Sequence, residues 1–345
     1  MGAEAPDAPI PQAPPAPDDR PPMPRDRATA AYRIAAAFGV ALAFALSVYT
    51  LLEVTRPSEG VIGFSFLLFL PAALCAFIAY VADPWADKKL TSYLMVPVIL
   101  LIIVILVSVP FLKEGTICIV MLSPLWLGSG MMGASLTYWV RKRIANKGRT
   151  YCAALLLLPI MAMQVEPRLP VPVETASVSR SVIIHAKPAE IWPLLEGVPN
   201  VRSDEGRWNI SQDVIGIPRP VGASLVGNGI GADRFARWQQ GIAFRERITQ
   251  WDMHRHIGWD FLFDDMTGWD ITDRHLMPDS PYFRVESGGY RLRPIGPNRT
   301  EVTLETQYRM RTHLNGYASL WGELILGDLE NNVLAVIRQR AEGHH

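Results

Sequence analysis

Five uninterrupted apolar segments occupy the first half of this 345-residue chain and limit what it can fold into. They run over about residues 31–54, 61–81, 93–112, 117–140 and 150–165. A helix needs about 20 apolar residues to cross the ~30 Å hydrocarbon core of a bilayer, and the first four segments meet that length. The fifth is shorter and contains Pro159, which leaves a short span, a re-entrant segment or an interfacial helix open. We therefore expect an all-α transmembrane module of four to five helices over residues 31–166.

Basic residues in the connecting loops predict how this module is oriented. The apolar segments predict a multi-pass inner (plasma) membrane protein. Because loops rich in lysine and arginine stay in the cytoplasm, the distribution of basic residues predicts a cytoplasmic N-terminus. If the fifth segment spans, the C-terminal half is extracytoplasmic. The count is eleven on one side, Arg20, Arg25, Arg27, Arg33, Lys88, Lys89, Arg141, Lys142, Arg143, Lys147 and Arg149, against Arg56 and Lys113 on the other.

The interiors of the segments contain no ionisable residues, whereas pumps and ion-coupled transporters usually place such groups there. A coupled transporter is therefore not expected. Small residues recur in the fourth segment, which lets helices approach closely either within the module or in a homo-oligomer formed through the spans. These residues are Gly128, Ser129, Gly130, Gly133 and Ala134.

The remaining composition excludes several classes of function. Residues 1–30 contain nine prolines and no apolar periodicity, so we expect a disordered tail. The chain has 33 basic and 33 acidic residues, which offers no basic stripe for a nucleic-acid partner. Cys75, Cys118 and Cys152 all lie inside apolar segments, which excludes a disulfide framework in the second half.

After a short proline-containing linker at residues 167–173, the pattern changes from continuous apolar runs to alternation. Alternation and turn residues predict strands from residue 178 and over 223–226, 229–238, 242–251, 256–263, 282–292 and 300–310, with a helix beginning at Pro188 after the first strand. Apolar residues at helical spacing predict one long amphipathic helix over residues 313–341. This order predicts an α+β domain with a curved antiparallel sheet wrapped around the long helix and a cavity between them.

Two stretches carry a resemblance to a known family. Residues 182–192, Val-Ile-Ile-His-Ala-Lys-Pro-Ala-Glu-Ile-Trp, resemble the strand-to-helix signature of the START-like superfamily, which includes polyketide cyclase/dehydrase and lipid-transport proteins and is also called SRPBCC. Residues 244–249, followed by Trp251 and Asp252, resemble its middle hairpin. For residues 174–343 the resemblance implies a helix-grip fold that holds an apolar ligand, such as a lipid, between sheet and helix.

Glu246 is the single residue most suggestive of chemistry, because alternation places it on one strand face with Ile242, Phe244 and Ile248. A carboxylate on a cavity-lining face is partly desolvated, so it either serves as a general acid or base or forms an ion pair with a residue such as Arg234. The full set of pocket candidates is Trp192, Arg234, Trp238, Phe244, Glu246, Trp259, Phe261, Tyr308, Tyr317, Trp321 and Leu324. Gly322 and Gly327 in the long helix are further candidates for close approach or ligand room.

The sequence is consistent with three functions. The first is a membrane-tethered domain that binds a lipid or other apolar small molecule at the membrane surface. The second is a cyclase or aromatase-type enzyme that uses Glu246 with Tyr290 or Tyr308, and the third is a non-catalytic membrane assembly module. We expect no cofactor and no metal, because His254, His256 and His275 and the nearby aspartates do not form a ligand set with defined spacing.

Overall fold

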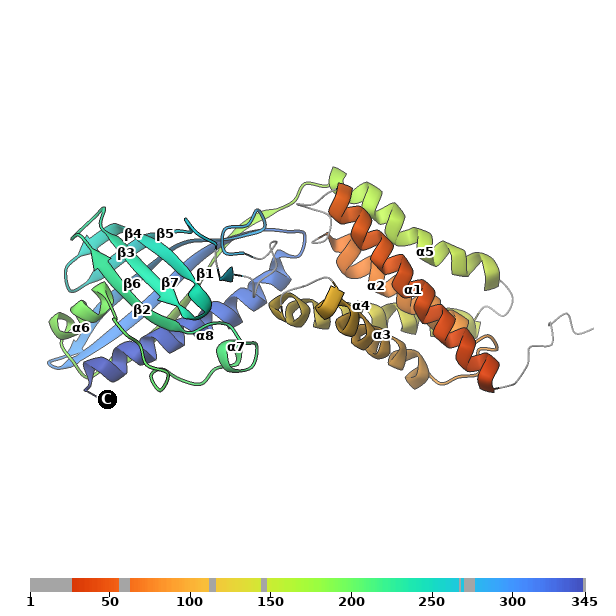
Figure 1. Cartoon of the computed structure of the whole chain (residues 1–345), viewed down its shortest axis with the longest axis horizontal. Coiled ribbons are helices and arrows are strands. Elements are labelled where there is room, and N and C mark those ends of the chain that lie inside the picture. The colour runs from red at the N-terminus through yellow and green to blue at the C-terminus, as the bar shows by residue number, and fades with distance from the viewer. Residues whose placement is uncertain are drawn as a thin grey trace, which may run out of the picture.

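The computed structural model describes residues 27–55, 63–111, 116–143, 148–266, 268–269 and 277–343. Most of the expected proline-rich tail, and also Arg56, Lys113, Lys147 and His275, lie outside these residues. Figure 1 shows two parts side by side: a bundle of apolar helices, and a curved sheet crossed by one long helix. The sheet and the long helix contact one end of the bundle.

The bundle consists of helices that alternate in direction and match the five apolar segments to within about one helical turn. They are α1 (Arg27–Thr55), the π-helical turn η1 (Ser65–Phe69) leading into α2 (Leu70–Ala82), α3 (Leu90–Phe111), α4 (Thr116–Arg143) and α5 (Gly148–Val165). Among the described residues, four stretches are long and apolar enough to cross a membrane: Thr29–Thr55, Ser65–Ala82, Leu90–Val107 and Ile119–Arg143. Helix α2 is central and packs against α1, α4 and α5.

The small residues of α4 bring it close to α2. A Cβ atom at Gly133 would lie 2.0 Å from the carbonyl oxygen of Ala72, and one at Gly130 would lie 2.8 Å from the Sγ atom of Cys75. The Ser129 hydroxyl donates a hydrogen bond to a carbonyl of the neighbouring segment. The small-residue stripe is therefore used for packing inside this bundle.

The end of the bundle farthest from the sheet is rich in basic side chains, and we call it the basic end. Arg141 donates hydrogen bonds to the carbonyl oxygens of Tyr80 (2.7 Å) and Pro84 (2.9 Å). The Arg33 guanidinium lies 5.6 Å from the ring centroid of Trp85. The start of α1, the end of α2 and the end of α4 therefore meet at this end.

The opposite end of the bundle contacts the sheet and long helix. The Ser65 amide donates to the Glu166 carboxylate at 3.2 Å, which joins η1 to the residue after α5. The Phe64 ring packs edge-on against His313 with 5.3 Å between centroids. The Tyr317 hydroxyl donates to a carbonyl oxygen of α4.

The second part is an antiparallel sheet of seven strands in the order β1-β7-β6-β5-β4-β3-β2. A 3-10 turn η2 (Glu166–Arg168) leads into β1 (Val173–Ile184), and the chain continues through α6 (Pro188–Glu196), α7 (Ile210–Asp213), β2 (Pro220–Val226), β3 (Asp233–Trp238), η3 (Gln239–Gly241), β4 (Ala243–Asp252), β5 (His256–Leu262), β6 (Phe283–Gly296), β7 (Arg299–Arg311) and α8 (Asn315–Ala341). Helix α8 packs across β1 and β7. The predicted α+β class, with a long C-terminal helix on an antiparallel sheet, is confirmed.

One strand begins later than its sequence pattern predicts. The stretch from Gly229 was expected to be extended, but Gly227, Gly229 and Gly231 all have positive φ angles of 77° to 91° and form the turn between β2 and β3. Glycine adopts this conformation at little cost because it lacks a Cβ atom. Alternation in β7 is confirmed, since every even-numbered residue from 300 to 310 is buried.

Apolar clusters pack beneath both halves of α8, and the larger cluster lies beneath its C-terminal part. Ile191 and Leu195 of α6 pack with Ile257, Val302 and Ile337 in a dry core beneath the C-terminal part of α8. Helix α6 covers only this end. A cavity lies beneath the turns of α8 that precede this part.

Candidate ligand cavity

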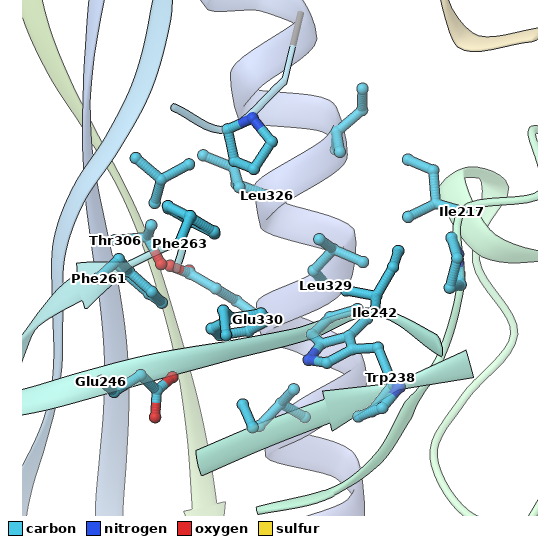
Figure 2. A pocket seen from close by; sticks show the side chains of 18 of the residues that line it. Ile217, Trp238, Ile242, Glu246, Phe261, Phe263, Thr306, Leu326, Leu329 and Glu330 are labelled. Atoms are coloured by element: carbon cyan, nitrogen blue, oxygen red, sulfur yellow. The ribbon is translucent and has the colours of Figure 1, made fainter. Parts of the chain in front are cut away.

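A cavity of about 290 Å³ lies between the sheet and α8. Its floor comes from strands β2 to β7, and its roof comes from one face of α8 that includes Leu326, Leu329 and Val333. Nearly all of the lining is apolar, and side chains from both the sheet and α8 point into it (Figure 2). A concave apolar site with a few polar groups is the usual form of a small-molecule binding site.

Aromatic rings form a continuous wall along the sheet side of the cavity. Phe244 is in contact with Trp238 (6.2 Å between ring centroids) and with Phe261 (5.8 Å), and Phe261 stacks on Phe263 at 6.2 Å. The wall continues through Trp259. These rings lie on adjacent antiparallel strands, and side chains that share a face of such strands come close enough to interact.

Arg234 and Glu246 form an ion pair within this apolar wall. They are directly opposed residues of β3 and β4. Arg234 Nη1 donates to Glu246 Oε2 at 2.5 Å, and each residue is only 5% exposed. The guanidinium also lies 5.2 Å from the Trp259 ring and 5.7 Å from the Tyr290 ring, within cation-π range.

The electrostatics of this pair reflect opposing effects of burial and charge. Burial raises the pKa of Glu246, and the charge of Arg234 opposes that rise. Burial favours a lower pKa for Arg234, but the charges of Glu246 and Tyr290 outweigh it and the pKa of Arg234 is raised. A guanidinium does not deprotonate in proteins, so Arg234 provides Glu246 with a permanent counter-charge.

A second carboxyl group, Glu330 of α8, enters the cavity from the opposite side. Glu330 is 3% exposed, and neither of its carboxylate oxygens forms a hydrogen bond of good geometry within the described residues. Figure 2 shows its side chain reaching from α8 toward Thr306 of β7. Burial raises the pKa of Glu330 to about 8, while the Thr306 hydroxyl and the charge of Arg180 act in the opposite direction.

One stretch of the cavity wall comes from the apolar bundle. Ile117 and Met121, in the first turns of α4, line the cavity together with Ala318 and Trp321 of α8. The Tyr317 hydroxyl fixes this arrangement through its hydrogen bond to the carbonyl of Met121. The cavity is therefore bounded by both parts of the chain.

The sequence-predicted pocket residues divide into two groups. Seven line the cavity: Arg234, Trp238, Phe244, Glu246, Trp259, Phe261 and Trp321. They are brought together because they share the concave face of the sheet or the facing side of α8. Their role in binding stays a prediction.

The other four candidates do not line the cavity. Trp192 belongs to the apolar core beneath α8, where it packs edge-on against Trp251, and its indole donates to Glu196 at 2.7 Å. Tyr308 fills a small cluster with Val178 and Met310 beneath α8. Tyr317 faces α4 and Leu324 is partly buried elsewhere on α8, so helical rotation carries both away from the cavity.

The two glycines of α8 have different neighbours. A Cβ atom at Gly322, which lines the cavity, would lie 2.5 Å from the Tyr308 hydroxyl. At Gly327 it would lie 2.2 Å from a guanidinium nitrogen of Arg180. Both positions allow a polar group of the sheet to approach the helix closely.

Sequence reasoning missed Glu330, Ile117 and Met121. A signal for Glu330 exists, since it lies at helical spacing from Leu326, Val333 and Ile337 and so interrupts the apolar stripe of α8. No local signal identifies the α4 residues, whose position depends on how the bundle contacts α8. Among the described residues, no group of three His, Cys, Asp or Glu side chains is placed to hold a metal ion.

Comparison with known proteins gives structural similarities only. No family model and no curated protein matches this chain. Norcoclaurine synthase from Thalictrum flavum, as a point mutant in complex with a transition state analogue, is similar over 50% of this chain and 98% of its own, with 14% identity and a TM-score of 0.33. The Zhui aromatase/cyclase from Streptomyces sp. R1128 is similar over 49% of this chain and 94% of its own, with 14% identity and a TM-score of 0.31.

Protein XoxI from Bacillus cereus is similar over 49% of this chain and 99% of its own, with 15% identity and a TM-score of 0.29. With identities below 20% and TM-scores below 0.5, these similarities carry no statement about ligand or activity. Membership of the START-like superfamily stays a prediction.

Proposed function

We propose that this protein is a membrane-tethered binding protein, whose C-terminal domain holds an apolar or amphipathic small molecule between its sheet and α8. The observation that carries the proposal is the apolar cavity of about 290 Å³, whose wall includes side chains of both the domain and helix α4. Burial of apolar surface in such a site contributes about 25 cal/mol per Å² and supplies most of the affinity for an apolar ligand.

The membrane part of the proposal is supported by the four long apolar helices. In our proposal α5 is a fifth span, because it packs along α2 and ends beside the start of η1. The basic end of the bundle, with Arg33 and Arg141, then faces the cytoplasm, and the binding domain at the opposite end is extracytoplasmic.

The bilayer is the proposed source of the ligand. An apolar molecule has a very low free concentration in water, and a domain attached directly to the membrane meets it at a high effective concentration. Ile117 and Met121 lie at the start of α4, which contains a candidate membrane span. A ligand moving along α4 therefore reaches the cavity without crossing water.

Binding is tested with the full-length protein in lipid nanodiscs and a fatty alcohol that carries an anthroyl fluorophore. The tryptophans of the cavity wall, including Trp238 and Trp259, should transfer excitation energy to the bound probe. Ala236→Phe places a larger side chain in the cavity and should weaken binding at least tenfold. Leu320→Phe, on α8 at a residue that is 68% exposed, should leave binding unchanged. If Ala236→Phe does not fold, Ala318→Phe replaces it. Absence of saturable energy transfer in the wild type would contradict the proposal.

The entry route is tested by enlarging the α4 side chains. Met121→Trp should slow both uptake and release of the probe several-fold, by a larger factor than it changes the equilibrium affinity. Leu136→Trp, at a 59% exposed position farther along α4, is the matched control. Equal exchange rates for both variants would show that the ligand enters elsewhere.

The enzymatic alternative, with Glu246 as acid or base, stays a prediction. The salt bridge to Arg234 holds the Glu246 carboxylate in one position and favours its charged form, as expected for the structural reading of this residue. The assembly-module alternative also stays a prediction.

A further inference from the structure

The binding proposal leaves one feature of the cavity unexplained. This apolar site contains a carboxyl group that lies near the Thr306 hydroxyl but has no hydrogen bond of good geometry within the described residues. Burying a polar group without a hydrogen bond costs several kcal/mol, and most buried polar side chains in proteins have a partner. Glu330 is almost completely buried, and within the described residues its carboxylate oxygens have no good hydrogen bond. A leucine or methionine would fill the same position on α8 without this cost.

The position of Glu330 shows which group is free to meet a ligand. Glu330 lies on the cavity-facing side of α8, between Leu326 and Val333. Arg234 Nη1 is already paired with Glu246 at 2.5 Å. Two other cavity-lining groups lack a hydrogen bond within the described residues, Arg234 Nε and the Trp259 indole nitrogen, and both can only donate. Glu330 therefore presents hydrogen-bonding capacity that the surrounding protein leaves unused.

We propose that Glu330 is the polar anchor of the ligand, and that the ligand is an apolar molecule carrying one hydrogen-bond donor, either a hydroxyl group or an amine. This inference rests on the proposed binding function. Carboxylate oxygens accept hydrogen bonds, so a donor on the ligand satisfies them. A carboxylate or phosphate on the ligand would instead face the carboxyl groups of Glu330 and Glu246.

The two possible donors differ in what they require of Glu330. Its pKa of about 8 leaves it mainly protonated at neutral pH, and in that form it both donates to and accepts from a hydroxyl. A protonated amine would stabilise the ionised form instead and bind as an ion pair. A glutamine at this position can still form hydrogen bonds with a hydroxyl, but it cannot form an ion pair with an amine. Glu330→Gln therefore distinguishes a hydroxyl ligand from an amine ligand.

The test uses four naphthalene probes with the full-length protein in nanodiscs, with partition into protein-free nanodiscs subtracted. The probes are 2-naphthol, 2-naphthylmethylamine, 2-methoxynaphthalene and 2-naphthoic acid, which share an apolar body and differ in the polar group. For the wild type we expect naphthol or the amine to bind at least tenfold more tightly than the methyl ether and the acid. Glu330→Leu should abolish this preference to within twofold without weakening binding of the ether.

Controls separate failure of the anchor from failure of binding. Glu330→Gln should keep a preference for naphthol and lose one for the amine, and Asp204→Asn, at an exposed position of the same domain, should behave as wild type. Glu330→Met replaces the leucine variant if that variant does not fold. If the ether binds the wild type as tightly as both donors, or if the preference survives Glu330→Leu, the anchor is refuted while binding stands. If no probe binds, both proposals fail.

Discussion

Glu330 should make the stability of this protein depend on pH. Burial raises its pKa from 4.5 to about 8, so between these values the folded state binds a proton that the unfolded state has lost. The contribution is therefore most favourable below pH 4.5 and is lost as pH rises through 8. Each pKa unit corresponds to about 1.4 kcal/mol, which makes the loss at pH 7 on the order of 3 kcal/mol. The charged groups that act on its pKa are Arg180 of β1, Glu305 of β7 and Glu323 of α8, and Glu330 in turn acts on the pKa of Tyr290 of β6. Arg234 of β3 and Glu246 of β4 line the same cavity.

Glu330→Gln removes this dependence, because an amide carries no charge at any of these pH values. Thermal unfolding followed at pH 5, 7 and 9 should show the variant more stable than wild type at pH 9 and similar to it at pH 5. Asp204→Asn, at an exposed position of the same domain, is the control. A parallel pH profile for wild type and Glu330→Gln would contradict the assignment.

The Arg234–Glu246 pair should be costly to break from one side. Arg234→Met leaves the Glu246 carboxylate buried among aromatic rings without its counter-charge, which is expected to cost about 3–5 kcal/mol. Arg234→Met combined with Glu246→Leu should recover most of that loss. A double-mutant cycle measured by denaturant unfolding gives the coupling energy, and additive effects of the two substitutions would show that the pair does not interact.

The contact of α2 with α4 depends on a missing side chain at Gly133. Even a Cβ atom there would overlap the carbonyl of Ala72, which is backbone and cannot move without moving α2. Gly133→Ala should lower the melting temperature by several degrees. Gly128→Ala, on the same helix with nothing within 4 Å of its added Cβ, should be neutral or slightly stabilising because alanine favours helix by about 1 kcal/mol. Equal melting temperatures for the two variants would contradict this close packing.

Elements with a strong periodic pattern were predictable from the sequence, and exceptions have local causes. Strand β7 alternates buried residues with partly buried or exposed ones along its length, and α8 begins within two residues of its predicted start. Strand β3 was predicted too early, because apolar alternation does not register the positive φ angles of Gly229 and Gly231. Glu330 was missed because a glutamate in a helix is ordinarily solvated, and only packing against β7 buries this one.

The proposed orientation of the whole molecule places the binding domain and the basic end on opposite sides of the membrane. Asp204 is an exposed residue of the domain, and Lys89 is an exposed residue near the basic end. A cysteine introduced at Asp204 should react with a membrane-impermeant maleimide in intact spheroplasts, whereas one at Lys89 should react only after permeabilisation. The native cysteines Cys75, Cys118 and Cys152 lie in apolar segments, and the parent protein serves as background control. The reverse labelling pattern would invert the topology.

Apolar runs, strand alternation and the stripe of α8 could be read from the sequence, because each depends on residues within a few turns or positions of one another. The aromatic candidates followed from the same alternation, since Trp238, Phe244 and Phe261 share one face of neighbouring strands. Three features required the folded chain: the pairing of Arg234 with Glu246, the burial of Glu330 opposite Thr306, and the placement of Met121 in the cavity wall. Each of these joins residues from different elements, and such contacts are created by packing rather than by local pattern.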